Sequence, residues 1–90
     1  MTARQVFYEG HVQGVGFRYT TKQVAMGFDV RGWVKNLADG RVEMLVLGDA
    51  DEVEDFLQEI RDSVLGGHIR NETVEEIVAP DGVTGFSIER

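Results

Sequence analysis

Ninety residues are enough for one hydrophobic core and not for two, so we expect a single domain over residues 1–90. Hydrophobic residues make up 42% of the chain and charged residues 28%, which is typical of a globular fold and not of a disordered or collagen-like chain. The absence of cysteine excludes disulfides, iron–sulfur clusters and thiolate catalysis, and the formal net charge of -7 argues against nucleic-acid binding through a broad basic surface.

The first third of the chain predicts a strand, a glycine-containing loop and a helix. Residues 5–12 alternate apolar and polar side chains, as a half-buried strand does. From Phe17 onward the apolar spacing changes to three and four residues, which predicts a helix that stops near Gly27. The loop between them contains Gly14 and Gly16.

The middle of the chain predicts a hairpin followed by a second helix. Residues 30–37 and 42–47 return to a period of two, and the Asp39-Gly40 pair between them is typical of a tight turn. Apolar residues then recur every three or four positions from Val53 to Val64, with acidic residues ahead of them. This is the strongest helical pattern in the chain.

The last third predicts two further strands. Gly66 and Gly67 are expected to stop the second helix, and residues 73–78 and 85–88 read as strands separated by a Pro-Asp-Gly turn. The resulting order is β-α-β-β-α-β with a short C-terminal strand. It predicts an α+β fold of the ferredoxin-like, split βαβ kind, with two helices on one face of a mainly antiparallel sheet.

The segment GHVQGVGFR, residues 10–18, has the composition of an anion-binding loop. Gly14 and Gly16 allow a backbone in which successive N–H groups converge, and the start of the helix adds unpaired N–H donors. Arg18 would add a positive charge and a planar fork suited to phosphate oxygens. The same residues could form only a tight turn with Arg18 on the surface, and the spacing alone leaves both interpretations open.

Two segments together resemble the signatures of the acylphosphatase family. They are GHVQGVGFR at residues 10–18 and GWVKNLADGRVE at residues 32–43, and their order and separation are also similar. The resemblance is weaker over residues 66–73, where family members often have a proline-containing stretch, so the path of that loop stays open. It implies hydrolysis of acyl phosphates to a carboxylate and inorganic phosphate, with no metal and no cofactor.

The resemblance also implies roles for individual residues. Arg18 corresponds to the phosphate-binding arginine and Asn36 to the asparagine that orients the attacking water. The phosphate cradle would consist of the backbone N–H groups of Gln13, Gly14, Val15, Gly16, Phe17 and Arg18. The topology independently favours a shared site, because parallel strands in a right-handed βαβ unit place the loop and Asn36 at the same edge of the sheet. Without the second motif, the interpretation that Asn36 only shapes the hairpin turn would be favoured.

Three other groups of residues have the composition of candidate sites. His11 and His68 are far apart in the sequence and on different elements, so we do not expect them to form a metal site. The acidic residues before the second helix are expected to stabilise its N-terminus instead of binding a cation. Phe7, Tyr8 and Trp33 could form a base-stacking surface, but no basic stripe accompanies them, so Trp33 is expected to pack on a sheet face.

Two related functions stay open beside acyl phosphate hydrolysis. The loop also resembles the carbamoyl-phosphate domain at the start of hydrogenase maturation proteins, and it would serve equally well in a phosphate-binding module without turnover. The longest apolar run, residues 44–47, is far too short to span a bilayer. We expect a cytoplasmic monomer with a small-molecule acyl phosphate as substrate and with no nucleic-acid or membrane partner.

Overall fold

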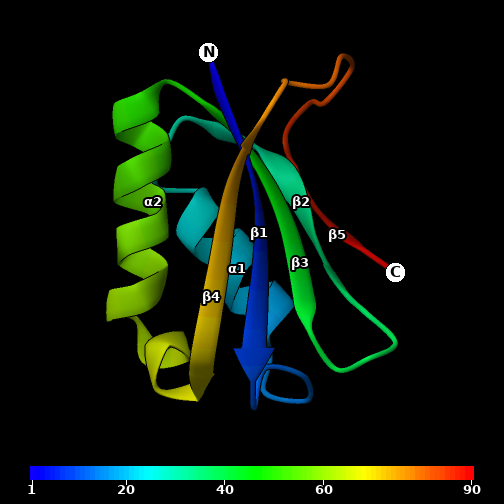
Figure 1. The fold of residues 1–90 in the computed structure, drawn as a ribbon. Helices are drawn as coiled ribbons and strands as arrows, with labels where there is room; N and C mark the ends of the chain where they lie inside the picture. The colour runs from blue at the N-terminus through cyan, green and yellow to red at the C-terminus, as the bar shows by residue number, and fades with distance from the viewer.

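The computed structural model describes residues 1–90 and consists of a five-stranded sheet with two α-helices on one face (Figure 1). The strands are β1 (Thr2–Gly10), β2 (Val30–Asn36), β3 (Val42–Gly48), β4 (Ile69–Ile77) and β5 (Phe86–Glu89). The helices are α1 (Phe17–Ala25), α2 (Ala50–Asp62) and a short 3-10 helix, η1 (Val64–His68). In the order β4-β1-β3-β2-β5 every neighbouring pair is antiparallel except β2 and β5, which confirms the predicted fold class.

Two strands, β1 and β4, begin earlier than predicted because pairing extends them beyond their local patterns. β1 covers Thr2–Gly10 and not residues 5–12, since its first residue pairs with Gly48 of β3. β4 begins at Ile69 and not at residue 73, since it pairs with β1 along that strand's length. Residues 66–73, whose path the sequence left open, are therefore the end of η1 and the start of β4.

The second helix ends earlier than its glycines suggest. The α-helical hydrogen bonding of α2 stops at Asp62, and Gly66 and Gly67 lie inside η1. Ser63 separates the two helices, and its side-chain oxygen accepts a hydrogen bond from the backbone N–H of Leu65 at 3.1 Å. This contact caps η1 and turns the chain toward β4.

The main core lies between the sheet and the two helices. It contains 15 buried residues, among them Val6 and Tyr8 of β1 and Phe56 of α2. Phe28, Phe56 and Phe86 form a row of edge-to-face rings, with centroids 6.0 and 5.7 Å apart. This row ties the C-terminal strand β5 to the helical layer, so β5 belongs to the folded core although it has only four residues.

The opposite face of the sheet carries a smaller apolar cluster. Trp33 packs there against Ala3, Leu45 and Leu47, which confirms its predicted role in packing on the sheet. Tyr8 is fully buried on the helical side, so the aromatic residues of β1 and β2 do not share one stacking surface. None of the helices is long and apolar enough to cross a membrane.

Candidate active site

The topology brings the glycine-containing loop and Asn36 to the same edge of the sheet, as predicted. β1 and β2 are both antiparallel to β3, so they run parallel to each other. Tyr8, near the end of β1, and Asn36, at the end of β2, are both paired with Val42 of β3. The loop that leaves β1 therefore starts level with Asn36.

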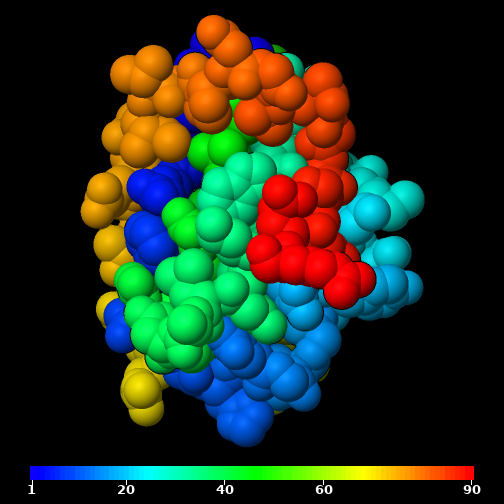
Figure 2. Space-filling model, turned by 90° about the vertical axis from the view of Figure 1, so that its right-hand side faces the viewer, coloured from blue at the N-terminus to red at the C-terminus, as the bar shows by residue number.

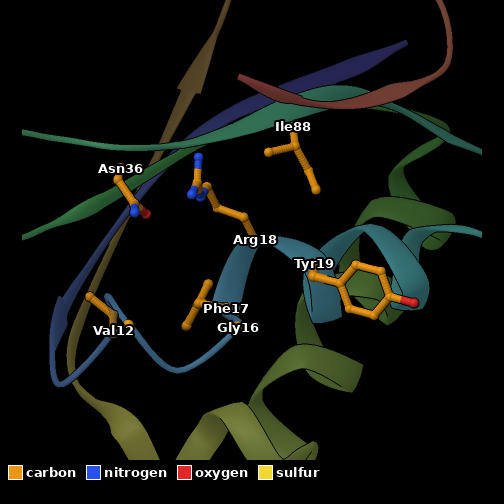
Figure 3. A pocket seen from close by; sticks show the side chains of 8 residues that line it. Val12, Gly16, Phe17, Arg18, Tyr19, Asn36 and Ile88 are labelled. Atoms are coloured by element: carbon orange, nitrogen blue, oxygen red, sulfur yellow. The ribbon is translucent and has the colours of Figure 1, made fainter. Parts of the chain in front are cut away.

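A cavity of about 200 Å³ lies between this loop, the start of α1 and the ends of β2 and β5 (Figure 3). It is lined by Val12, Gly14, Gly16, Phe17, Arg18, Tyr19, Asn36 and Ile88. The cavity thus brings together Arg18, Asn36 and part of the proposed cradle. Gln13 and Val15 do not line it, whereas Tyr19 and Ile88 do, although no sequence motif predicts them there. A larger hollow of about 290 Å³ beside Arg61 holds none of the predicted site residues.

The backbone of the loop has the conformation expected of an anion cradle. Gly14 and Gly16 have φ values of +79° and +75°, in the left-handed region that L side chains rarely adopt. An added Cβ at either position would meet no atom within 4 Å, so the backbone angle and not crowding requires glycine. Gly16 is also the N-cap of α1, whose first turn contains no acidic residue. The N-terminus of α1, with its unpaired N–H groups and its positive dipole end, therefore lies at the cavity without a competing carboxylate in its first turn.

Arg18 is the one charged side chain that lines the cavity. It lies in the first turn of α1 and is half-buried. Its Nη1 donates a hydrogen bond to the backbone oxygen of Glu89 on β5 at 3.1 Å. Figure 3 shows the guanidinium reaching from the helix toward Asn36, over the loop. The C-terminal strand thus holds the cation at the cavity while leaving its other donors available.

Asn36 lines the cavity and carries an unpaired acceptor. Its Oδ1 is buried and accepts no hydrogen bond from the protein. A buried acceptor without a partner costs about 1–3 kcal/mol, so a donor from a water molecule or a ligand would stabilise it. The side-chain amide can also donate two hydrogen bonds, which suits a group that holds a water against an anion.

Gln13 has a structural contact that the sequence did not suggest. Its Nε2 donates to the backbone oxygens of Leu37 and Arg41, at 2.8 and 2.9 Å. These two carbonyls lie at the start and the end of the turn that joins β2, which ends at Asn36, to β3. The Gln13 side chain therefore ties the loop to the hairpin that carries Asn36. An amide in a loop has no local signal for such a role, because its partners are 24 and 28 residues away.

Replacing Gln13 by leucine should loosen the loop and weaken phosphate binding. The loss of two neutral hydrogen bonds should lower the free energy of unfolding by about 1–2 kcal/mol, measured by urea denaturation. The inhibition constant of inorganic phosphate should rise by severalfold. The control is Gln58→Leu, which removes a side-chain hydrogen bond to Asp62 on the exposed surface of α2. If both variants bind phosphate equally well, Gln13 does not hold the loop in place.

Two titrating groups near the site have displaced pKa values. In the hairpin turn, hydrogen bonds from the backbone N–H and the Nε of Arg41, at 3.1 and 2.8 Å, hold the pKa of the Asp39 carboxyl below its ordinary value. Burial, together with the carboxylate of Glu72, raises the pKa of the Tyr8 hydroxyl. Asp39 is therefore charged and Tyr8 neutral at pH 7. Neither side chain lines the cavity.

His11 and His68, which are far apart in the sequence, lie next to each other in the structure. The rings of His11 and His68 have centroids 5.8 Å apart, and the backbone N–H of His11 donates to the backbone oxygen of His68 at 3.0 Å. The antiparallel pairing of Gly10 with Ile69 causes this proximity. His11 also follows β1 and is not part of a strand. No group of three or more residues that could hold a metal ion forms around them or elsewhere.

The acidic residues around α2 make structural contacts. Glu52 accepts a hydrogen bond from the backbone N–H of Asp29 at 2.6 Å, and Glu54 forms an ion pair with Arg4. Asp49 occupies the N-cap position but its side chain makes no capping hydrogen bond. The expected stabilisation of the helix start by Asp49 is therefore limited to its charge.

This chain is similar along nearly its whole length to proteins of known family. The family model described as Acylphosphatase matches residues 4–88. An acylphosphatase of Thermotoga petrophila is 39% identical over 89 residues, which cover 99% of this chain and 98% of that protein. The crystal structure of acylphosphatase from Bacillus subtilis matches with a TM-score of 0.90 and 33% identity, covering 100% of both chains. Full-length HypF, in a phosphate- and nucleotide-bound form, matches with a TM-score of 0.89 and 30% identity over 99% of this chain and 12% of that one.

Proposed function

This chain belongs to the acylphosphatase family and is an acylphosphatase, an enzyme that hydrolyses acyl phosphates, and from that premise we propose how its cavity performs the reaction. The phosphate group binds between the residue 13–18 loop and Arg18, and Asn36 orients the attacking water. The observation that carries this proposal is the single cavity that joins a left-handed glycine loop, the N-terminus of α1, Arg18 and Asn36.

Phosphate binding rests on the direction of the donors. The loop has positive φ at Gly14 and Gly16, a backbone conformation that allows successive N–H groups to converge on an anion. The first turn of α1 adds its unpaired donors and dipole at the same place. Arg18 supplies a full positive charge, and its hydrogen bond to the backbone oxygen of Glu89 holds the guanidinium at the cavity. These groups can neutralise the charge that spreads over the phosphoryl oxygens during transfer.

The reaction needs no general acid or general base from the protein. The oxygen of water forms a bond to phosphorus while the bond between phosphorus and the acyl oxygen breaks. The acyl oxygen keeps the electron pair and leaves as a stable carboxylate, so no general acid has to protonate it. The water proton passes to an oxygen of the substrate's own phosphate, and the products are a carboxylate and inorganic phosphate. The protein contributes position and charge neutralisation.

Asn36 is the residue that positions the water. Its buried Oδ1 has no hydrogen-bond partner in the protein and can accept a hydrogen from the water molecule. Its amide nitrogen can donate to a phosphate oxygen at the same time. An amide cannot act as a base at neutral pH, which agrees with proton transfer to the phosphate itself.

The reaction as proposed proceeds without a metal ion. The purified enzyme should hydrolyse benzoyl phosphate in excess EDTA, with a rate within about twofold of the rate before chelation. Release of benzoate and inorganic phosphate in equal amounts, followed by ultraviolet absorbance and a phosphate assay, measures this. A rate that EDTA abolishes and added Mg²⁺ restores would show that a metal takes part. Phosphate binding without any hydrolysis would instead indicate a binding module.

A further inference from the structure

The cavity has an apolar side that the proposed chemistry does not use. Ile88 and Tyr19 line it and remain 36% and 64% exposed, whereas the lining residues Val12 and Phe17 are buried in the core. Ile88 therefore has free surface at the mouth of the cavity. It lies one residue before Glu89, whose backbone oxygen accepts the hydrogen bond from Arg18.

The parallel pairing of β5 with β2 places Ile88 beside the site. Ile88 is opposite Val34 in that pairing, two residues before Asn36 on β2. Figure 3 shows the Ile88 side chain pointing from β5 toward Arg18. Figure 2 shows the C-terminal residues, in red, on the surface above the blue residues of the loop and of α1. The acyl group attached to a phosphate bound in the loop would extend along this apolar surface.

The charges around the cavity disfavour a second negative group on the substrate. Arg18 is its one charged lining residue, and the phosphate engages that cation. Lys22 on α1 and Arg90 after β5 do not line the cavity, and Lys35 on β2 is paired with Glu43 at 3.7 Å. A carboxylate on the acyl group would therefore lose part of its hydration without gaining a cationic partner. The net charge of -7 would also repel it.

We propose that the acyl group lies against Ile88 and Tyr19, and that the enzyme selects acyl phosphates whose acyl group is uncharged and apolar. This inference rests on the proposed function, because the bound phosphate sets where the acyl group begins. Ile88 is the specificity-determining residue, since its exposed side chain both lines the cavity and adjoins Arg18.

Benzoyl phosphate and 4-carboxybenzoyl phosphate test this selectivity, because they differ only by a carboxylate away from the reacting bond. Each kcat/KM is divided by the rate constant for uncatalysed hydrolysis in the same buffer. The normalised value should be at least about tenfold higher for benzoyl phosphate, as expected when a charged group loses its hydration without a partner. Equal normalised values would overturn the inference.

The variant Ile88→Lys should change this preference by placing an ammonium beside the acyl group. We expect the ratio of the two normalised values to fall by about tenfold or more. Val78→Lys is the matched control, because Val78 is 91% exposed, lies beyond the end of β4 and does not line the cavity. Both substitutions change the net charge equally, so a similar change of the ratio in both variants would overturn the role of Ile88.

A third variant keeps the test independent of the folding of Ile88→Lys. Ile88→Ser should lower kcat/KM for benzoyl phosphate by about fivefold more than it lowers kcat/KM for acetyl phosphate, whose acyl group offers little apolar surface to Ile88. Equal losses with both substrates would overturn the proposed contact. Hydrolysis of neither substrate by the wild-type enzyme would overturn the proposed function itself, which separates the two failures.

Discussion

Replacing Arg18 by glutamine is expected to lower kcat/KM for benzoyl phosphate by about a thousandfold or more and to abolish measurable binding of orthophosphate. The guanidinium is the one charge that lines the cavity, so no other side chain can take over its role. At about 4 Å from a phosphate oxygen, a unit charge contributes on the order of 4 kcal/mol at an effective dielectric constant near 20. Glutamine keeps a hydrogen-bond donor but removes this charge.

The loss in Arg18→Gln should come from chemistry and not from unfolding. The substitution costs the fold one hydrogen bond to the oxygen of Glu89, or about 0.5–1.5 kcal/mol. Arg31→Gln is a matched control, because Nη1 of Arg31 also donates to a backbone oxygen, that of Val83, at 3.1 Å. Its activity should stay near that of the wild type. Activity of Arg18→Gln within a few-fold of the wild type would contradict the assignment of Arg18.

Replacing Asn36 by alanine should separate turnover from phosphate binding. The rate constant kcat should fall by about a hundredfold or more, as when a positioned polar group is removed from an active site. Orthophosphate should still bind with an inhibition constant within a few-fold of the wild-type value, because the loop and Arg18 stay in place. Steady-state kinetics with benzoyl phosphate, with and without added phosphate, measures both quantities.

Asn71→Ala is the control for Asn36→Ala. Asn71 lies on β4, and its side chain donates to Glu9 at 2.9 Å on the exposed surface. This variant should keep both turnover and phosphate inhibition. If Asn36→Ala loses phosphate binding to the same extent as turnover, then Asn36 shapes the cavity and does not hold the water.

The amino-acid sequence by itself determined the fold class and the centre of the candidate site. The alternation around Tyr8 and Val34 and the three-and-four spacing around Phe56 are local patterns, and each element needs only such a pattern to bury one face. The left-handed angles at Gly14 and Gly16 also follow from residue type, since few other residues adopt them. The meeting of the loop with Asn36 follows from the parallel strands of a βαβ unit.

Only the tertiary structure decided which distant side chains complete the site and which merely lie nearby. It brought Ile88 to the cavity, turned the Gln13 side chain to the hairpin, and placed His68 beside His11. The contact of His11 with His68 depends on the pairing of β1 with β4, and the place of Ile88 depends on the parallel docking of β5 against β2. Local apolar patterns set which face of a strand is buried, but the register between strands far apart in the chain comes from packing of the whole core.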